Sequence, residues 1–273
     1  MTGLILAFIF GSIVGSFLNV CIYRMPLNKS VVWPGSHCPE CEKRIPWHDN
    51  IPFISYIFLK GKCRFCGKRI SPRYLLVELL TAIAFALLFK YYGLSFNFFF
   101  YTVFTCALII ATFVDIPHRI IPDEISVGGL LLGLALSAVK GVNLQHFSYS
   151  LKPLLNSFIG AAAGAGIIYL TGFLFDLVYF KLLKRPAIQG ETESMGGGDV
   201  KLMAMIGAFL GWEKAVLTFF IAPFFGAIVG VINLIAKKDH TIPYGPFLSL
   251  AAILSLFWAH KIIAFIFGGF SSF

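Results

Sequence analysis

Residues 96–117 read FNFFFYTVFTCALIIATFVDIP, and this stretch decides the fold class. The apolar run Phe96–Val114 has the length that a helix needs to cross the hydrocarbon core of a bilayer. It ends in Asp115, and Pro117 is expected to stop the helix there. A carboxylate beside a membrane-crossing run is costly to bury, so Asp115 is a candidate functional residue by default.

The rest of the 273-residue chain is equally apolar. It is 58% hydrophobic and 13% charged, with a mean hydropathy of +0.83, whereas a soluble domain carries about 25% charged residues. Apolar segments recur along nearly the whole length, which excludes a soluble module on a single anchor. We predict an all-α polytopic membrane protein with about eight transmembrane helices. The predicted spans are Gly3–Tyr23, Tyr74–Tyr92, Phe96–Val114, Ile125–Val139, Pro153–Phe180, Val200–Leu210, Ala215–Ile235 and Phe247–Phe267.

Two of these segments are short. Ile125–Val139 lies below the usual length of a span, and Val200–Leu210 is too short to cross a bilayer unaided. Trp212 and Glu213 follow it, so it is alternatively one half of a helical hairpin. The first segment has no charged residue before it and Arg24 after it, which favours an uncleaved helix with its N-terminus outside.

Basic residues are concentrated in alternate loops. Segment 24–73 holds ten of the 22 Lys and Arg residues, and the positive-inside rule places such loops in the cytoplasm. With this topology Asp115 and Asp199 lie at the same cytoplasmic face. The net charge of +9 then reflects topology and attraction to lipid, and no nucleic-acid partner is expected because the basic residues lack a binding motif. The other basic residues assigned to this side are Arg119, Lys181, Lys184, Arg185, Lys201, Lys237 and Lys238.

The same loop contains four cysteines in the pattern C-x2-C-x21-C-x2-C. Such pairs can point at one tetrahedral ion, although the central spacing is one residue beyond the usual window. Four thiolates leave no position for water, so we predict a structural zinc that staples a domain too small for a large core. Two disulfides are disfavoured in the cytoplasm, and a redox centre is disfavoured without a βαβ pattern. The ligands are Cys38, Cys41, Cys63 and Cys66, with His37 and His48 as competing ligands.

Asp199 follows a run of three glycines and precedes an apolar run. Its structural interpretation is an N-cap for a helix that starts at Val200. A cap does not need three glycines, whereas residues without side chains let a substrate backbone approach closely. We therefore take Asp199 as a catalytic candidate. The substrate-access residues that accompany it are Gly196, Gly197, Gly198 and Lys201.

Asp115 is harder to explain structurally, because the macrodipole disfavours negative charge at a helix C-terminus. A pairing with His118 or Arg119 is the structural alternative. Two carboxylates that meet can share a proton and activate water, as in aspartic proteases. From the helix dipoles we expect Asp115 to hold that proton and Asp199, its pKa lowered by a helix N-terminus, to deprotonate the attacking water.

Two other aspartates receive lesser roles. Asp123 follows Pro122 and is predicted to cap the fourth helix. Asp176 in the fifth span is a weaker catalytic candidate, because no glycine or proline motif surrounds it.

Five motifs, in order along the chain, resemble those of the bacterial type IV prepilin peptidases, a family of GxGD-type aspartic proteases. Each motif is short, but the five together are specific and cover nearly the whole chain. They are GSFLNVCIYRMP at 15–26, the cysteine quartet, DIPHRIIPD at 115–123, MGGGDVK at 195–201 and IPYGPFL at 242–248.

The resemblance implies a bifunctional enzyme of the bacterial cytoplasmic (inner) membrane. Asp115 and Asp199 match the catalytic pair, which cuts the basic leader of type IV prepilins or pseudopilins after a glycine at the cytoplasmic face. The substrates serve a type IV pilus or a type II secretion system. The cysteine-bearing loop goes with N-methylation of the new N-terminal residue by S-adenosyl-L-methionine. The implied domains are a first helix at 1–23, a zinc-binding loop at 24–73 and a peptidase at 74–273.

The methyl-donor site does not follow from the residues, since no G-x-G-x-x-G motif follows a strand pattern. Arg24, Glu78 and Lys201 are candidates for substrate handling, and Asn19 for helix packing. Two rival functions stay open. A proton-coupled transporter would place its carboxylates near the membrane midplane, and a zinc-dependent scaffold without chemistry would tolerate Asp→Asn at both catalytic candidates.

Overall fold

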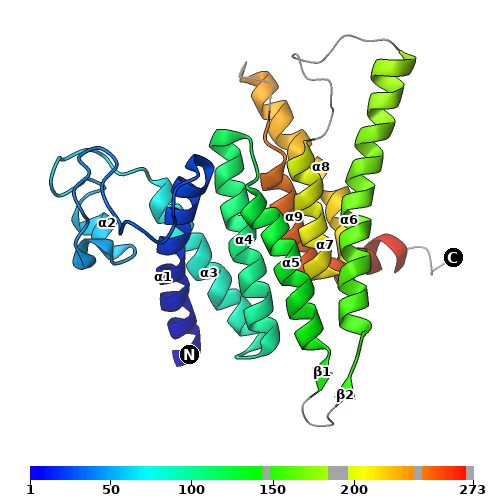
Figure 1. Cartoon of the computed structure of the whole chain (residues 1–273), viewed down its shortest axis with the longest axis horizontal. Helices are drawn as coiled ribbons and strands as arrows, with labels where there is room; N and C mark the ends of the chain where they lie inside the picture. The colour runs from blue at the N-terminus through cyan, green and yellow to red at the C-terminus, as the bar shows by residue number, and fades with distance from the viewer. Residues whose placement is uncertain (144–147, 184–195, 237–241, 269–273) are drawn as a thin grey trace. The chain divides into compact units, whose positions relative to one another are not determined.

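Helices make up most of the part of the chain that the structure describes (Figure 1). The computed structural model describes residues 1–143, 148–183, 196–236 and 242–268, so Lys184, Arg185, Lys237 and Lys238 lie outside it. The prediction of an α-helical membrane protein is confirmed. The helices are α1 (Thr2–Arg24), α2 (Ile54–Phe58), α3 (Arg73–Tyr92), α4 (Phe96–His118), α5 (Asp123–Lys140), α6 (Lys152–Asp176), α7 (Gly197–Leu210), α8 (Trp212–Ile235) and α9 (Gly245–Gly268).

The remaining elements are short. Tight helical turns cover Met25–Leu27 and Trp47–Asn50, and a π-helical segment, Leu177–Leu182, continues α6. The strands β1 (Val142–Asn143) and β2 (Ser148–Tyr149) pair antiparallel between α5 and α6.

Six helices among the described residues are long and apolar enough to cross a membrane, namely α1, α3, α4, α6, α8 and α9. All eight predicted segments are helical, but α5 and α7 do not qualify as spans. The six candidate spans among the described residues are thus slightly fewer than the expected number of about eight. α7 has 14 residues and is about 21 Å long, whereas a hydrocarbon core is about 30 Å thick.

The chain divides into two compact units, Met1–Val114 and Asp115–Phe273. In the first unit α1 packs against α3 through glycines. A Cβ added at Gly15 would lie 2.7 Å from the Cα of Glu78. A Cβ at Gly11 would lie 2.9 Å from the Cα of Ala82. Because Gly11 and Gly15 have no side chain, the backbones of α1 and α3 can approach closely, as is common between membrane helices.

α7 is the central helix of the second unit. It packs against α5, α6, α8 and α9, and every residue from Leu202 to Leu210 is buried. Gly207 of α7 and Gly160 of α6 face each other so closely that a Cβ on either would clash with the backbone of the other. Gly211 alone, with a φ of 80°, links α7 to α8 and the two helices pack together, as the hairpin alternative predicted. Because other helices enclose α7, it does not need the length of a lipid-facing span.

Candidate active site and metal site

Asp115 lies in the last turn of α4, with 5% of its surface exposed. The helix continues through Pro117 to His118, so the expected stop at the proline is wrong. Arg119 closes the helix instead. Its φ of 54° lets its N–H donate to the Asp115 carbonyl at 2.8 Å. The Asp115 side chain therefore projects from a hydrogen-bonded turn.

The start of α9 supplies a hydrogen-bond donor to the Asp115 carboxylate. The backbone N–H of Gly245 donates to Asp115 Oδ2 at 3.0 Å, and such a bond favours an ionised carboxylate. A Cβ at Gly245 would lie 2.7 Å from the same oxygen, so only glycine fits without movement. From the sequence, Gly245 was identified only as part of the motif IPYGPFL. Its role as a donor to Asp115 was not predictable, because the two residues are 130 positions apart along the chain.

Asp199 lies in the first turn of α7. The helix begins at Gly197 with Gly196 as its N-cap, so the predicted helix start at Val200 and the predicted N-cap role of Asp199 are wrong. Burial raises the pKa of Asp199 to about 7, and the neighbouring Asp115 carboxylate adds to the shift. The two aspartates singled out from the sequence are thus close enough to interact electrostatically.

The expected lowering of the pKa of Asp199 is also wrong. A helix N-terminus stabilises a nearby negative charge by about 1 kcal/mol. Removal from water and a second carboxylate act in the opposite direction and outweigh it. These effects favour keeping the resting proton of the pair on Asp199 and leaving Asp115, which accepts the Gly245 N–H, as the ionised partner. Tyr244 stays neutral beside them, because burial and Asp199 raise its pKa to about 12.

The glycine run before Asp199 is open. Gly196 and Gly197 are exposed, and a Cβ at Gly197 would meet nothing within 4 Å. None of the three glycines has a positive φ, so the backbone conformation does not require glycine there. Ile121 lies 3.4 Å from the Cβ positions of both Gly198 and Gly245 and lines the site from the α4–α5 connection.

Lys201 pairs with Asp123. Its Nζ lies 2.7 and 3.0 Å from the two carboxylate oxygens of Asp123, on an exposed part of the second unit. Asp123 is itself the first residue of α5 and makes no capping bond, so its predicted N-cap role is wrong. The ion pair links the first turn of α5 to the second turn of α7.

Three further polar residues singled out from the sequence lie in the unit Met1–Val114. Arg24 is buried and donates to two loop carbonyls at 3.0 and 3.3 Å. Asn19 donates to a carbonyl of α3 at 3.0 Å, in keeping with a packing role. Glu78 accepts a hydrogen bond from the backbone N–H of Phe53 at 3.0 Å. These three side chains tie α1, α3 and the loop between them together.

The four cysteines of this loop converge on one point. Their sulfur atoms all lie within 4.8 Å of one another, and Cys38 Sγ is 3.9 Å from Cys66 Sγ. In a tetrahedral zinc site with Zn–S bonds of 2.3 Å, sulfurs are about 3.8 Å apart. The cluster therefore fits a metal ion held by four thiolates. The flanking histidines face other groups: His37 Nδ1 lies 3.0 Å from the Gly35 carbonyl oxygen, and His48 Nε2 lies 3.8 Å from an Asp49 carboxylate oxygen.

The two halves of the metal site are a structural repeat. Each pair begins C-x-x-C-x-K-R-I, at Cys38–Ile45 and Cys63–Ile70. In each the first cysteine N–H donates to the carbonyl of the lysine five residues later, at 3.0 and 2.8 Å. The contacts between the halves are reciprocal. Lys68 pairs with Glu40 at 3.2 Å, and Lys43, at the matching position, lies over the Phe65 ring at 5.2 Å.

Two family models match the chain. The bacterial Peptidase A24 N-terminal domain matches residues 9–92, and the type IV leader peptidase family matches residues 102–231. No solved structure shows a significant match.

Several curated proteins named prepilin leader peptidase/N-methyltransferase are also similar. The protein of Myxococcus xanthus is 36% identical over 84% of this chain, which spans only 62% of that relative. The protein of Pseudomonas putida is 32% identical over 95% of this chain and 92% of its own length. The protein of Pseudomonas aeruginosa is 33% identical over 92% and 89%. None of these names carries the transporter function that the sequence left open.

Proposed function

Because this chain belongs to the type IV leader peptidase family, we propose that it is a membrane-embedded aspartic endopeptidase for type IV prepilins or pseudopilins. We place it in the bacterial inner membrane, with the active site facing the cytoplasm. The observation that carries the proposal is that the fold brings Asp115 and Asp199 to one site. Ile121 lies 3.4 Å from the Cβ positions of both Gly198, which precedes Asp199, and Gly245, whose N–H binds Asp115.

The proposed mechanism divides the work between the two acids. Asp115, held by the Gly245 N–H, takes a proton from water as the water oxygen attacks the scissile carbonyl carbon. Asp199 gives its proton to the carbonyl oxygen, producing a tetrahedral intermediate. As the C–N bond breaks, the leaving nitrogen takes the proton from Asp115, and Asp199 recovers its own from the collapsing hydroxyl. No other side chain has to change its protonation state.

The open glycine run supports an extended substrate backbone beside Asp199. Gly197 has free space around it, and Gly196 and Gly198 present only main chain to an approaching peptide. We propose that the residues on either side of the prepilin cleavage site lie here, with the basic leader on the cytoplasmic side. Lys201 contributes by holding α7 against α5 through Asp123.

The second proposed activity is methylation of the newly exposed N-terminal amine by S-adenosyl-L-methionine. It is supported by the name that the relatives carry and by the cysteine cluster in the matched N-terminal domain. Cys38, Cys41, Cys63 and Cys66 would hold a structural zinc, whose closed shell leaves no position for a reacting group.

The experiment that tests the function combines purified protein, a prepilin with a Gly-Phe junction and S-adenosylmethionine in detergent. We expect mass spectrometry to show a product that starts at the phenylalanine and carries one added methyl group. Intact prepilin would contradict the peptidase proposal. A cleaved product without the methyl group would contradict only the second activity.

The pH profile should report the Asp199 proton. The pKa of Asp199 is about 7, so Asp199 is protonated below that pH and ionised above it, and the mechanism needs it protonated. We expect kcat/KM for cleavage to fall about tenfold per pH unit above neutrality, because kcat/KM reports the groups of the free enzyme. Measurements between pH 6 and 9 on a fluorogenic leader peptide would check this. A kcat/KM that increases across that range would instead indicate that Asp115 holds the resting proton.

Gly245→Ala should damage cleavage without unfolding the protein. The added Cβ would lie 2.7 Å from Asp115 Oδ2 and displace the carboxylate, and a shift of about 1 Å in a reacting group lowers kcat about 100-fold. Gly166→Ala in α6 is the matched control, since a Cβ there meets nothing within 4 Å. Equal cleavage rates for the two variants would show that the Asp115–Gly245 contact is not needed.

A further inference from the structure

The short helix α2 in the loop between α1 and α3 has an exposed apolar face. Ile54, Ile57 and Phe58 are 51%, 68% and 82% exposed. Their spacing of three and four residues puts them on one side of the helix. Ser55, on the other side, is buried. Three large apolar side chains on one exposed face mark an interaction surface.

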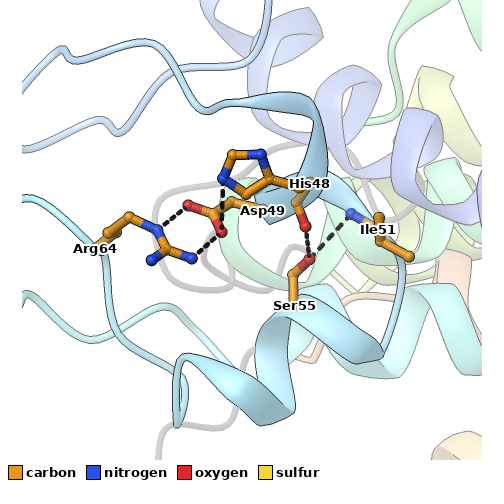
Figure 2. A network of polar contacts seen from close by, with 5 residues as sticks. All are labelled: His48, Asp49, Ile51, Ser55 and Arg64. Carbon is orange, nitrogen blue, oxygen red and sulfur yellow. Dashed lines mark hydrogen bonds and ion pairs between the residues drawn. The ribbon is translucent and has the colours of Figure 1, made fainter.

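Most backbone N–H groups around this face have an acceptor within the protein. Figure 2 shows how the segment begins: Ser55 Oγ accepts a bond from the Ile51 N–H at 3.0 Å and donates to the His48 carbonyl at 2.9 Å. The neighbouring charge is also paired, since Arg64 donates two hydrogen bonds to Asp49 at 2.6 and 2.5 Å. The backbone N–H groups with a protein acceptor include those of Ile51, Phe53, Ile54, Ser55, Ile57 and Leu59.

Lipid offers no hydrogen-bond partners, so a segment in contact with it must pair its backbone N–H groups within the protein and expose apolar side chains. Irregular backbone is tolerated at membrane depth only where its polar groups are hydrogen-bonded by protein or line water. In this segment Pro52 has no N–H that would need an acceptor. The N–H of the next residue, Phe53, donates to the carboxylate of Glu78 in the membrane helix α3.

Two contacts show that this segment lies beside the membrane helices α1 and α3, at some distance from the ends that carry the loop. The Phe53 ring stacks on Phe8 at 5.9 Å between centroids, and Phe8 is about 24 Å before Arg24 along α1. Glu78, which binds the Phe53 N–H, is about 8 Å into α3 from Arg73. Figure 1 accordingly shows α2 level with the middle of α1 rather than beyond its end. Segment 51–58 thus lies alongside the apolar parts of α1 and α3 rather than beyond their ends.

We propose that residues 51–58 form a re-entrant element inserted in the bilayer that the chain spans, with lipid acyl chains against Ile54, Ile57 and Phe58. Glu78 anchors the element by accepting the Phe53 N–H. Trp47, 81% exposed where the segment begins, lies at the interfacial level that tryptophan favours. Lys60, just after the segment, extends its ammonium group back to the lipid headgroups. The metal-binding knuckles are thereby fastened to the membrane at a third point besides α1 and α3.

A photo-crosslinking experiment tests this placement in the full-length protein. The phenylalanine analogue p-benzoylphenylalanine replaces Phe58, Phe10 or Lys62 in separate samples reconstituted in phosphatidylethanolamine–phosphatidylglycerol vesicles. Phe10 is an exposed residue of α1, and Lys62 is an exposed residue of the same loop. Mass spectrometry should find lipid adducts at Phe58 as often as at Phe10, and about tenfold more often than at Lys62. A yield at Phe58 as low as that at Lys62 would overturn the proposal.

The anchoring role of Glu78 has its own test. Glu78→Gln keeps an acceptor oxygen for the Phe53 N–H, whereas Glu78→Leu removes it. We expect lipid adducts at residue 58 to persist with Gln and to fall about fivefold or more with Leu, since an unpaired N–H opposes insertion in hydrocarbon. Metal content is measured in parallel, so that loss of the loop fold is recognised. Undiminished adducts in a metal-loaded Leu variant would show that Glu78 does not anchor the segment.

Discussion

Asp115→Asn is expected to lower kcat/KM for leader cleavage by about 10²–10⁴-fold, the range that loss of a general base or acid costs. The variant keeps an oxygen that can accept the Gly245 N–H, so the local geometry survives while the base is lost. Asp199→Asn should have a similar effect through loss of the proton donor. The two losses should not add in the double variant, because the residues act as a unit.

The measurement is cleavage of a prepilin peptide by variants whose thermal unfolding in detergent matches that of the wild type. Asp123→Asn is the matched control. It removes a carboxylate near the same face but breaks only an exposed pair with Lys201, which costs about 1 kcal/mol of stability or less. We expect this control to retain cleavage within about threefold. Full cleavage by either Asp115→Asn or Asp199→Asn would exclude the aspartic mechanism and favour a scaffold role.

The membrane fold was predictable because bilayer thickness dictates the length of a span. All eight predicted segments are helical, but α5 and α7 are not long and apolar enough to count as spans. For α7 the reason is that other helices enclose it, so it needs no lipid-facing length. The Gly160–Gly207 contact that encloses α7 joins residues 47 positions apart. Neither glycine is distinguishable in the sequence from its many apolar neighbours.

The active-site pair was predictable in identity but not in electrostatics. Each aspartate stands out because a carboxylate beside an apolar run is costly. The proton was assigned to Asp115 from the helix dipoles, which are local. Burial of Asp199, the Asp115 charge and the Gly245 donor depend on tertiary contacts and favour the opposite assignment. The paired roles of Lys201 and Asp123 were missed for the same reason, since 78 residues separate them.

The spacing of the four cysteines predicted a metal site. The repeated pattern C-x-x-C-x-K-R-I around them is stronger evidence for such a site than the spacing alone. Lys43 and Lys68 follow their knuckles at the same offset, and each contacts the opposite knuckle. Short-range repetition of this kind predicts a pseudo-twofold module, in which both halves are needed to complete one tetrahedral shell.

Removing one thiolate should therefore empty the site and unfold both knuckles. Cys63→Ser leaves three sulfur ligands, and the loop has little other core to compensate, because structural zinc supplies about 10–16 kcal/mol to modules of this kind. We expect elemental analysis to find one zinc per wild-type chain and under about a tenth of that in the variant. Limited proteolysis should then cut within residues 36–71, which resist in the wild type.

Cys106→Ser is the control, since Cys106 lies in α4 and belongs to no metal cluster among the described residues. It should keep its zinc and its protease resistance.

The Cys63→Ser variant also separates the two proposed activities. Asp115, Asp199 and Gly245 all belong to the unit Asp115–Phe273, whereas the cysteines belong to the other unit. Cys63→Ser should therefore retain cleavage within about threefold and lose methylation. Loss of both activities in a protein whose α-helical content is intact would mean that the metal module also shapes the peptidase site. A wild-type protein purified without zinc would refute the metal site itself.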